Sequence, residues 1–146
     1  MCVHVKLGSM IKKKAQTVEM HMLFRALADR TRLRLLNLIG QDEVCVCYLV
    51  EVLRTPQPKI SRHLAYLKKA GVVSARREGK WMHYRINEPA ETHAAQVFTD
   101  TRQWLLNDPV MQRERGRLVQ LCCAKTPAHL EGAPKPLVSS SNPPRV

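Results

Sequence analysis

The chain has 146 residues, of which 45% are hydrophobic, and a net charge of +12. This length and composition fit one folded domain with tails and exclude a wholly disordered chain, while the charge indicates a polyanionic partner. No apolar run approaches the roughly 20 residues that cross a bilayer, and the first residues lack the apolar core of a secretory signal. We therefore expect a cytoplasmic protein without a membrane partner. Five cysteines, an odd number in a reducing compartment, argue against a disulfide framework.

Helical spacing of apolar residues predicts the first elements of the fold. A basic N-terminal extension over residues 1–14 precedes the main domain, which we expect over residues 15–107. A helix is predicted from the start of this domain to about Leu27. A second helix follows, which Asp29 can cap and Gly40 can end.

The next stretch predicts two short helices and a hairpin. Residues 42–53, DEVCVCYLVEVL, predict a third, short helix that opens with two acids, as the helix dipole favours. After the break at TPQP, a fourth helix is predicted over residues 57–70 and ends at Gly71. Residues 72–86, VVSARREGKWMHYRI, predict two strands joined by a turn at Glu78-Gly79.

The last part of the chain predicts two more helices and a tail. Pro89 and neighbouring acids open a long helix, and Asp108 can cap a C-terminal helix over residues 108–124. Residues 125–146 hold five of the nine prolines and three consecutive serines, a composition typical of a disordered tail. The predicted fold class is therefore mainly α with one β-hairpin.

Basic residues gather in the middle of the chain, where nine Lys or Arg side chains and one acid, Glu78, lie between Arg54 and Arg85. Two short helices followed by a hairpin describe a winged helix-turn-helix, whose second helix enters the major groove of double-stranded DNA. An exposed Lys or Arg is often only solvated, and a histidine in the turn can be structural. The candidate DNA-binding residues are Gln57, Lys59, Ser61, Arg62 and His63 on the fourth helix, and Arg76, Arg77 and Lys80 on the hairpin.

Two cysteines, Cys45 and Cys47, stand one residue apart at the start of the predicted third helix. They can be small buried hydrophobes, as free cysteines often are. However, residues i and i+2 of a helix point about 200° apart, so burying both on one face is awkward. In a first turn that can rearrange, two thiolates can converge on one soft ion. Spacing alone leaves both interpretations open.

Four motifs together make the sequence similar to the ArsR family of winged-helix repressors, and most of all to its arsenic-responsive branch. They are LADRTRLRLL, VCVCYL, QPKISRHLAYLKKAGVV and GKWMHYRI, in that order, within about Phe24 to Asn87. The resemblance implies a homodimer, built on the first and last helices, that represses its operon until trivalent arsenic or antimony binds as inducer. It also implies that Cys45 and Cys47 are ligands and that the fourth helix reads the operator. No catalytic cofactor and no enzymatic activity are implied.

The sequence departs from the family in two places. Many arsenic-responsive members carry a third cysteine where this chain has Val50, and zinc-responsive relatives carry a histidine where Arg102 follows Asp100. A zinc site of that type is therefore not expected. Three further cysteines, Cys122, Cys123 and Cys2, lie outside the resemblance, and the pair Cys122-Cys123 can complete the metal site, form a separate one, or simply end a packed helix.

Two other functions stay open at this point. One is a repressor that senses oxidation through its thiols, and the other is a cadmium or zinc sensor of the same fold. For an arsenic sensor, pulling Cys45 and Cys47 onto one ion is expected to deform the third helix and misalign the recognition helix beside it. The sequence does not separate arsenite from methylarsenite or antimonite.

Overall fold

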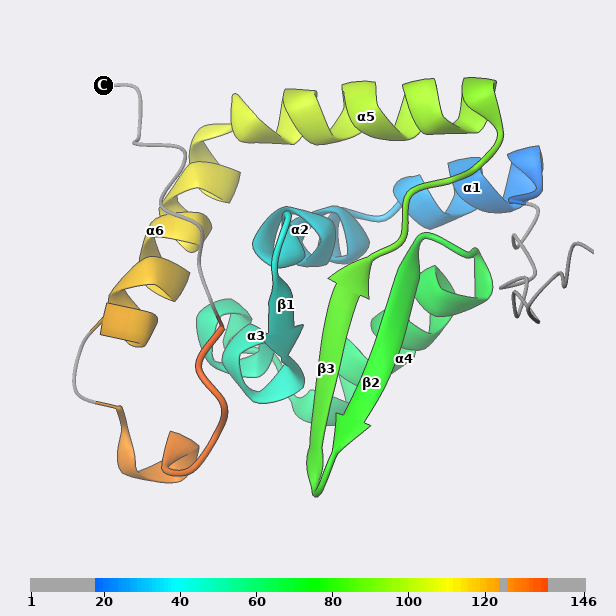
Figure 1. Ribbon diagram of the computed structural model, residues 1–146. Helices are drawn as coiled ribbons and strands as arrows, with labels where there is room; N and C mark the ends of the chain where they lie inside the picture. Colours follow the sequence, from blue (N-terminus) through cyan, green and yellow to red (C-terminus); the bar gives the residue numbers. More distant parts are fainter. Residues whose placement is uncertain (1–17, 124–125, 137–146) are drawn as a thin grey trace, which may run out of the picture.

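The computed structural model describes residues 18–123 and 126–136 (Figure 1). The expected N-terminal extension over residues 1–14, together with Cys2 and the last ten residues, lies outside this part of the chain. Within the described residues, no helix combines the length and apolar character needed to span a membrane.

Helices α1 (Met20–Leu27) and α2 (Arg30–Ile39) begin the fold and meet at Asp29. The Asp29 side chain accepts a hydrogen bond from the backbone N–H of Arg32 at 2.9 Å, which confirms the predicted N-cap. Gly40 ends α2 with a φ of +57°, a conformation that favours glycine. Since α2 contacts α4, α5 and α6 as well as α1, it is the central helix of the core.

A helix-turn-helix follows, made of α3 (Val46–Leu53) and α4 (Gln57–Lys69). Ile60, Leu64 and Leu67 are fully buried on α4, as their helical spacing predicts. The two helices pack against each other, so the position of α4 depends on that of α3.

The sheet has three antiparallel strands in the order β1-β3-β2, one more than the hairpin predicts. Strands β2 (Val73–Glu78) and β3 (Trp81–Ile86) form the expected hairpin, with Gly79 at a φ of +56° in the turn. The added strand is β1 (Glu43–Cys45), which pairs with β3 and not with a sequence neighbour. Figure 1 shows β1 running beside β3 and leading directly into α3.

The expectation that a helix covers all of residues 42–53 is therefore wrong at its start. Glu43–Cys45 is a strand, Cys45 is the extended N-cap residue, and the helix begins at Val46. Pairing with β3 satisfies backbone groups that a helical first turn would leave unpaired, and it buries Val44 completely. The local sequence pattern favours a helix over these three residues, but pairing with the distant strand β3 makes them a strand.

Helices α5 (Thr92–Leu106) and α6 (Pro109–Cys123) complete the helical part. Asp108 caps α6 as predicted, because its Oδ1 accepts hydrogen bonds from the backbone N–H groups of Val110 and Met111. Helix α6 is fixed to α2 by the Asn37 amide, which donates to the Met111 carbonyl at 2.9 Å. An ion pair joins the same helices where Arg34 Nε donates to Glu114 at 2.8 Å.

Part of the expected disordered tail is folded onto the molecule. Residues 126–136, which we name the strap, include the short 3₁₀ helix η1 (Ala128–Leu130). Leu130 is 2% exposed and Ala133 is also buried. His129 lies 2.7 Å from Glu51 of α3. These few apolar contacts oppose the disorder that a proline-rich composition favours.

Candidate functional site

The outer face of α4 carries most of the predicted base-reading residues. Gln57, Lys59 and Arg62 are exposed, since the opposite face of the helix is fixed in the core by its buried leucines and isoleucine. Ser61 is half-buried on the same helix. Amide, hydroxyl and guanidinium groups in this arrangement can reach base edges and phosphates in a major groove.

His63 differs from its neighbours on α4. Its side chain is largely shielded, and Nδ1 lies 3.6 Å from Oδ1 of Asp29, the N-cap residue of α2. This contact ties the recognition helix to the start of α2. The structure thus gives His63 a packing role, which the sequence leaves open beside a DNA contact.

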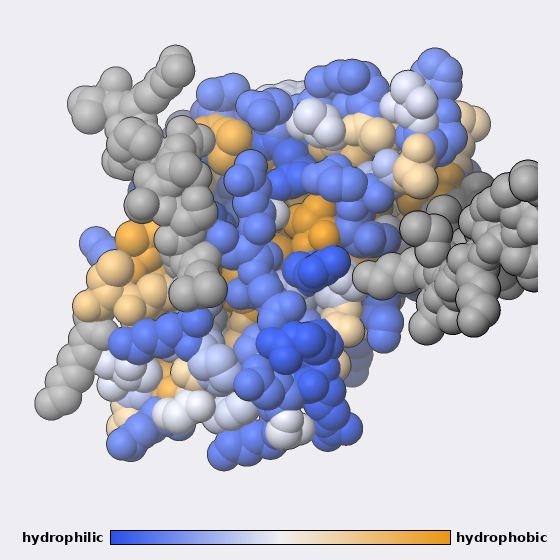
Figure 2. All heavy atoms as spheres, in the orientation of Figure 1, coloured by the Kyte–Doolittle hydropathy of each residue, from blue (hydrophilic) through white to orange (hydrophobic). Residues whose placement is uncertain are grey.

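The β2–β3 hairpin, which we call the wing, carries the three other predicted DNA-binding residues, and these lie in different surroundings. The Arg77 side chain donates to the backbone carbonyl of Gly79 at 3.2 Å, and the Lys80 ammonium lies 4.9 Å from the centre of the Trp81 ring. Both side chains stand on the exposed end of the hairpin, where Figure 2 shows a hydrophilic surface. Arg76 is engaged instead with Glu43 of β1, to which its Nε donates at 3.0 Å.

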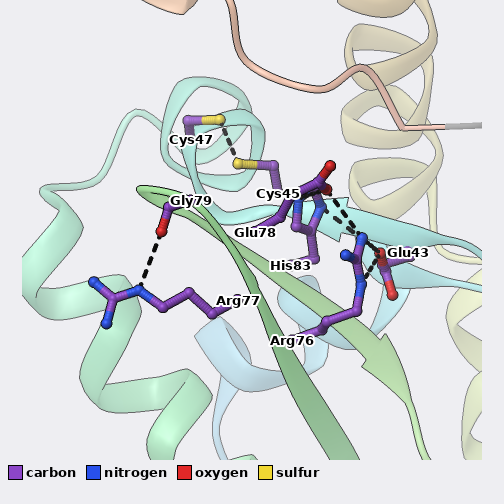
Figure 3. A network of polar contacts seen from close by, with 8 residues as sticks. All are labelled: Glu43, Cys45, Cys47, Arg76, Arg77, Glu78, Gly79 and His83. Carbon is purple, nitrogen blue, oxygen red and sulfur yellow. Dashed lines mark hydrogen bonds and ion pairs between the residues drawn. The ribbon is translucent and has the colours of Figure 1, made fainter.

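The two cysteines of the CxC motif come together where β1 becomes α3. Cys45 is 0% exposed and Cys47 is half-buried, and their sulfur atoms lie 2.7 Å apart (Figure 3). An extended residue followed by the first turn of a helix turns both side chains to one side, which a continuous helix would not do. The change from strand to helix is therefore what makes this pair.

The two thiols share one hydrogen bond and so titrate as a pair. The hydrogen bond from the Cys47 thiol lowers the pKa of Cys45 to about 7, against an ordinary value of 9.0. The same hydrogen bond, together with burial, raises the pKa of Cys47. One thiolate is therefore available near neutral pH, and a second forms only when its proton leaves to another acceptor.

The second cysteine pair lies in the last turn of α6, a helix that packs against α3. Cys122 is half-buried and Cys123 is exposed, and burial raises the pKa of Cys122 to about 11. Among the described residues, no group of three or more His, Cys, Asp or Glu side chains is close enough to hold a metal ion. The fold of one chain thus brings Cys45 and Cys47 together and does not bring Cys122 or Cys123 to them.

Sequence reasoning missed several residues around the CxC motif. Tyr48 is fully buried beside it, and its hydroxyl has no hydrogen-bond partner among the described residues. Glu43 and His83 flank Cys45, the first on the same strand and the second directly opposite on β3. Only recognition of EVC as a strand paired with WMHYRI would have placed them here.

An apolar groove lies between α1 and α5. Phe24, Leu27, Val97 and Trp104 line it, and Trp104 is 79% exposed. Monomeric proteins rarely expose apolar side chains of this size together. The face therefore offers a surface for association.

A supporting helix, a recognition helix and a wing make this a winged helix-turn-helix DNA-binding protein, with a dithiol at the start of the supporting helix. Residues 29–75 match the family model described as bacterial regulatory protein, arsR family. The chain is 38% identical over 110 residues to the arsenic resistance transcriptional regulator ArsR1 of Pseudomonas putida, covering 70% of this chain and 86% of that protein. The protein therefore belongs to the ArsR family of bacterial transcription regulators.

Two further comparisons agree with this assignment. The arsenical resistance operon repressor of Escherichia coli is 44% identical over 79 residues, which cover 53% of this chain and 68% of the repressor. Among solved structures, HlyU from Vibrio cholerae superposes with a TM-score of 0.50 at 26% identity, covering 57% of this chain and 88% of HlyU. The sequence of the domain thus matches that of a known repressor, and its fold matches that of HlyU.

Proposed function

We propose that the protein is a metalloregulatory repressor that binds operator DNA as a dimer and is released when trivalent arsenic binds the thiolates of Cys45 and Cys47. The observation that carries this proposal is the 2.7 Å separation of the two sulfur atoms at the start of α3, the helix that packs on the recognition helix. The names of the two relatives, both regulators of arsenic resistance, support the same inducer.

The chemistry of the pair suits a soft, thiol-seeking ion. Each arsenic–sulfur bond forms as a thiol loses its proton and an arsenic hydroxyl leaves as water, so two bonds release two waters. Thiolates select such ions over hard cations, which prefer oxygen ligands. Arsenite, methylarsenite and antimonite are the candidate inducers.

The number of sulfur ligands bears on which arsenic species binds. Cys45 and Cys47 supply two sulfurs, which suits methylarsenite because its carbon substituent already occupies the third position. Inorganic arsenite prefers three sulfurs, and we retain Cys122 or Cys123 as the proposed third ligand, supplied by movement of the α6 end or across the dimer. The pair can instead form a separate site. If both inducers release DNA from a Cys122→Ser/Cys123→Ser variant at unchanged concentrations, the pair has no sensing role and Cys45 and Cys47 act alone.

DNA binding follows from the arrangement of α4 and the wing in a symmetric dimer. We propose that the apolar face of α1 and α5 forms the dimer contact, which leaves both recognition helices free. The operator is then an imperfect palindrome with half-sites about one helical turn, roughly 34–36 Å, apart or a multiple of it. Arg62→Ala should lower operator affinity, and Lys80→Ala should mainly reduce its salt dependence.

Release follows from the position of the thiols. Binding of one arsenic by Cys45 and Cys47 inserts an ion at two sulfur atoms that lie only 2.7 Å apart, which changes the strand-to-helix junction, and α3 passes the change to α4 because the two pack together. Coupling between two sites of this kind is typically about 5–150-fold in affinity.

Fluorescence anisotropy of a labelled duplex from the protein's own promoter tests the proposal. Arsenite, methylarsenite and antimonite should release the DNA from the wild type, whereas Cys45→Ser and Cys47→Ser should bind the duplex and resist release. Release by peroxide alone would favour the redox alternative, and release by cadmium or zinc alone would favour the other metal sensor. Equal binding to random duplex at moderate salt would refute the repressor function.

A further inference from the structure

The three strands of the sheet place a row of side chains between the cysteine pair and the wing. Cys45 on β1 is opposite His83 on β3, and His83 is opposite Arg76 on β2. Residues directly opposite in an antiparallel sheet project from the same face. The inducer site and the wing are therefore joined by one row of neighbouring side chains across the sheet.

Two carboxylates close this row into a network, which we name the wing tie: Glu43, Arg76, Glu78 and His83 (Figure 3). The Arg76 guanidinium donates to Glu43 at 3.0 Å and to Glu78 at 3.2 Å. His83 is 5% exposed and lies 3.1 Å from Glu78 and 3.8 Å from Glu43. Glu43 stands two residues before Cys45 on the same short strand, so a shift of β1 moves an anchor of Arg76.

The neighbouring arginine lies on the other side of the same strand. Figure 3 shows Arg77 pointing away from Glu43, and within residues 18–123 and 126–136 its side chain donates a hydrogen bond only to the Gly79 carbonyl. The Arg76 side chain is 53% exposed, yet two carboxylates hold it in place. Arg77 is also exposed, but it has no carboxylate partner among the described residues. The two residues thus have the same chemistry and opposite surroundings.

We propose that Arg76 is a positioning residue rather than a phosphate contact, and that inducer binding at Cys45 acts on the wing through the wing tie. This inference rests on the proposed function, because it concerns the route by which the inducer releases DNA. It adds a second route, through β1 and the sheet, to the route through α3 and α4. Phosphate binding at the wing belongs in this account to Arg77 and Lys80.

Arg76→Ala and its matched control Arg77→Ala separate the two roles. For each variant, binding to the promoter duplex is measured over a range of salt concentrations, with and without methylarsenite and arsenite. A lost phosphate contact lowers the salt slope by about 0.9 per wing. Arg77→Ala should show this decrease with an unchanged ratio of inducer-free to inducer-bound affinity.

Arg76→Ala should show the opposite pattern. Its salt slope should stay at the wild-type value, while the affinity ratio should fall by about 2- to 30-fold, the range found for residues along coupling networks. Glu43→Gln should reproduce the loss, and the double variant should add nothing further because both changes break the same tie. A slope decrease in Arg76→Ala equal to that of Arg77→Ala, or an unchanged affinity ratio, would overturn the proposal.

Hydrogen exchange keeps the test separate from the proposed function. Arg76→Ala should speed amide exchange in β1 and β3, and Arg77→Ala should leave it unchanged. If neither arsenical releases DNA from the wild type, the proposed function fails, and the wing tie is then judged by exchange alone. If Arg76→Ala and Arg77→Ala show equal amide exchange in β1 and β3, the proposed role of Arg76 in the wing tie is overturned.

Discussion

Replacing Glu114 by Gln tests how firmly α6 is fixed to the core. Glu114 is 3% exposed, and one of its carboxylate oxygens accepts two hydrogen bonds from the Arg34 guanidinium. The other oxygen has no partner among the described residues. The variant keeps the shape of the side chain but leaves the Arg34 charge without its counter-ion in a mostly buried position.

The size of the expected loss in the free energy of unfolding follows from the exposure of the Glu114 and Arg34 side chains. Breaking a fully buried ion pair costs about 3–5 kcal/mol because an uncompensated charge stays behind. The Arg34 side chain is 24% exposed, so water relieves part of this penalty. We therefore expect Glu114→Gln to lower the free energy of unfolding by about 2–3 kcal/mol.

Urea unfolding followed by circular dichroism measures this loss at low protein concentration, with dimer concentration held constant across variants. Arg34→Met/Glu114→Leu is the matched control, because replacing both partners by apolar residues removes the unpaired charge and should restore most of the stability. A loss below about 0.5 kcal/mol in Glu114→Gln would show that the pair behaves like an exposed one and would refute the reasoning.

Three other predictions concern the thiols, the dimer face and the strap. Cys47→Ala removes the hydrogen bond that lowers the pKa of Cys45, so this pKa should rise from about 7 to 9.0 or above. The ultraviolet absorbance of the thiolate near neutral pH should therefore fall. An unchanged titration curve would contradict this prediction. Trp104→Ala removes a side chain that the monomer fold does not bury, so it should weaken dimerisation roughly 30-fold in sedimentation equilibrium without changing the circular dichroism spectrum. Unchanged dimerisation would count against the α1–α5 face. Leu130→Ala removes the buried anchor of the strap and should speed amide hydrogen exchange in residues 126–136 at least about tenfold. If the variant and the wild type exchange at the same rate, Leu130 does not hold the strap in place.

The elements with strong local patterns were predictable. Asp29 and Asp108 cap the helices that they were expected to cap, and Ile60 with its helical neighbours faces the core. These features depend on residues within a few positions of one another. The hairpin around Gly79 belongs to the same class, since its turn chemistry is local.

What the sequence did not predict depends on distant partners. The strand Glu43–Cys45 exists because β3, some forty residues later, pairs with it, and the strap is folded because it buries Leu130 and Ala133 and contacts Glu51 of α3. The contact between Arg76 and Glu43 was not predicted either, because it joins two residues that are distant in the sequence and that only the sheet brings together. Long-range pairing of this kind carries no local pattern.

Arsenic-edge X-ray absorption spectroscopy of the loaded protein tests the central claim most directly, because it reports the sulfur atoms bound to arsenic. The wild type and the Cys122→Ser/Cys123→Ser variant, each loaded with methylarsenite, should both show two protein sulfurs. Adding Cys45→Ser/Cys47→Ser to the Cys122→Ser/Cys123→Ser variant should abolish this two-sulfur coordination, because neither cysteine pair then remains. If that variant keeps the same arsenic–sulfur coordination as the wild type, Cys45 and Cys47 are not the inducer site.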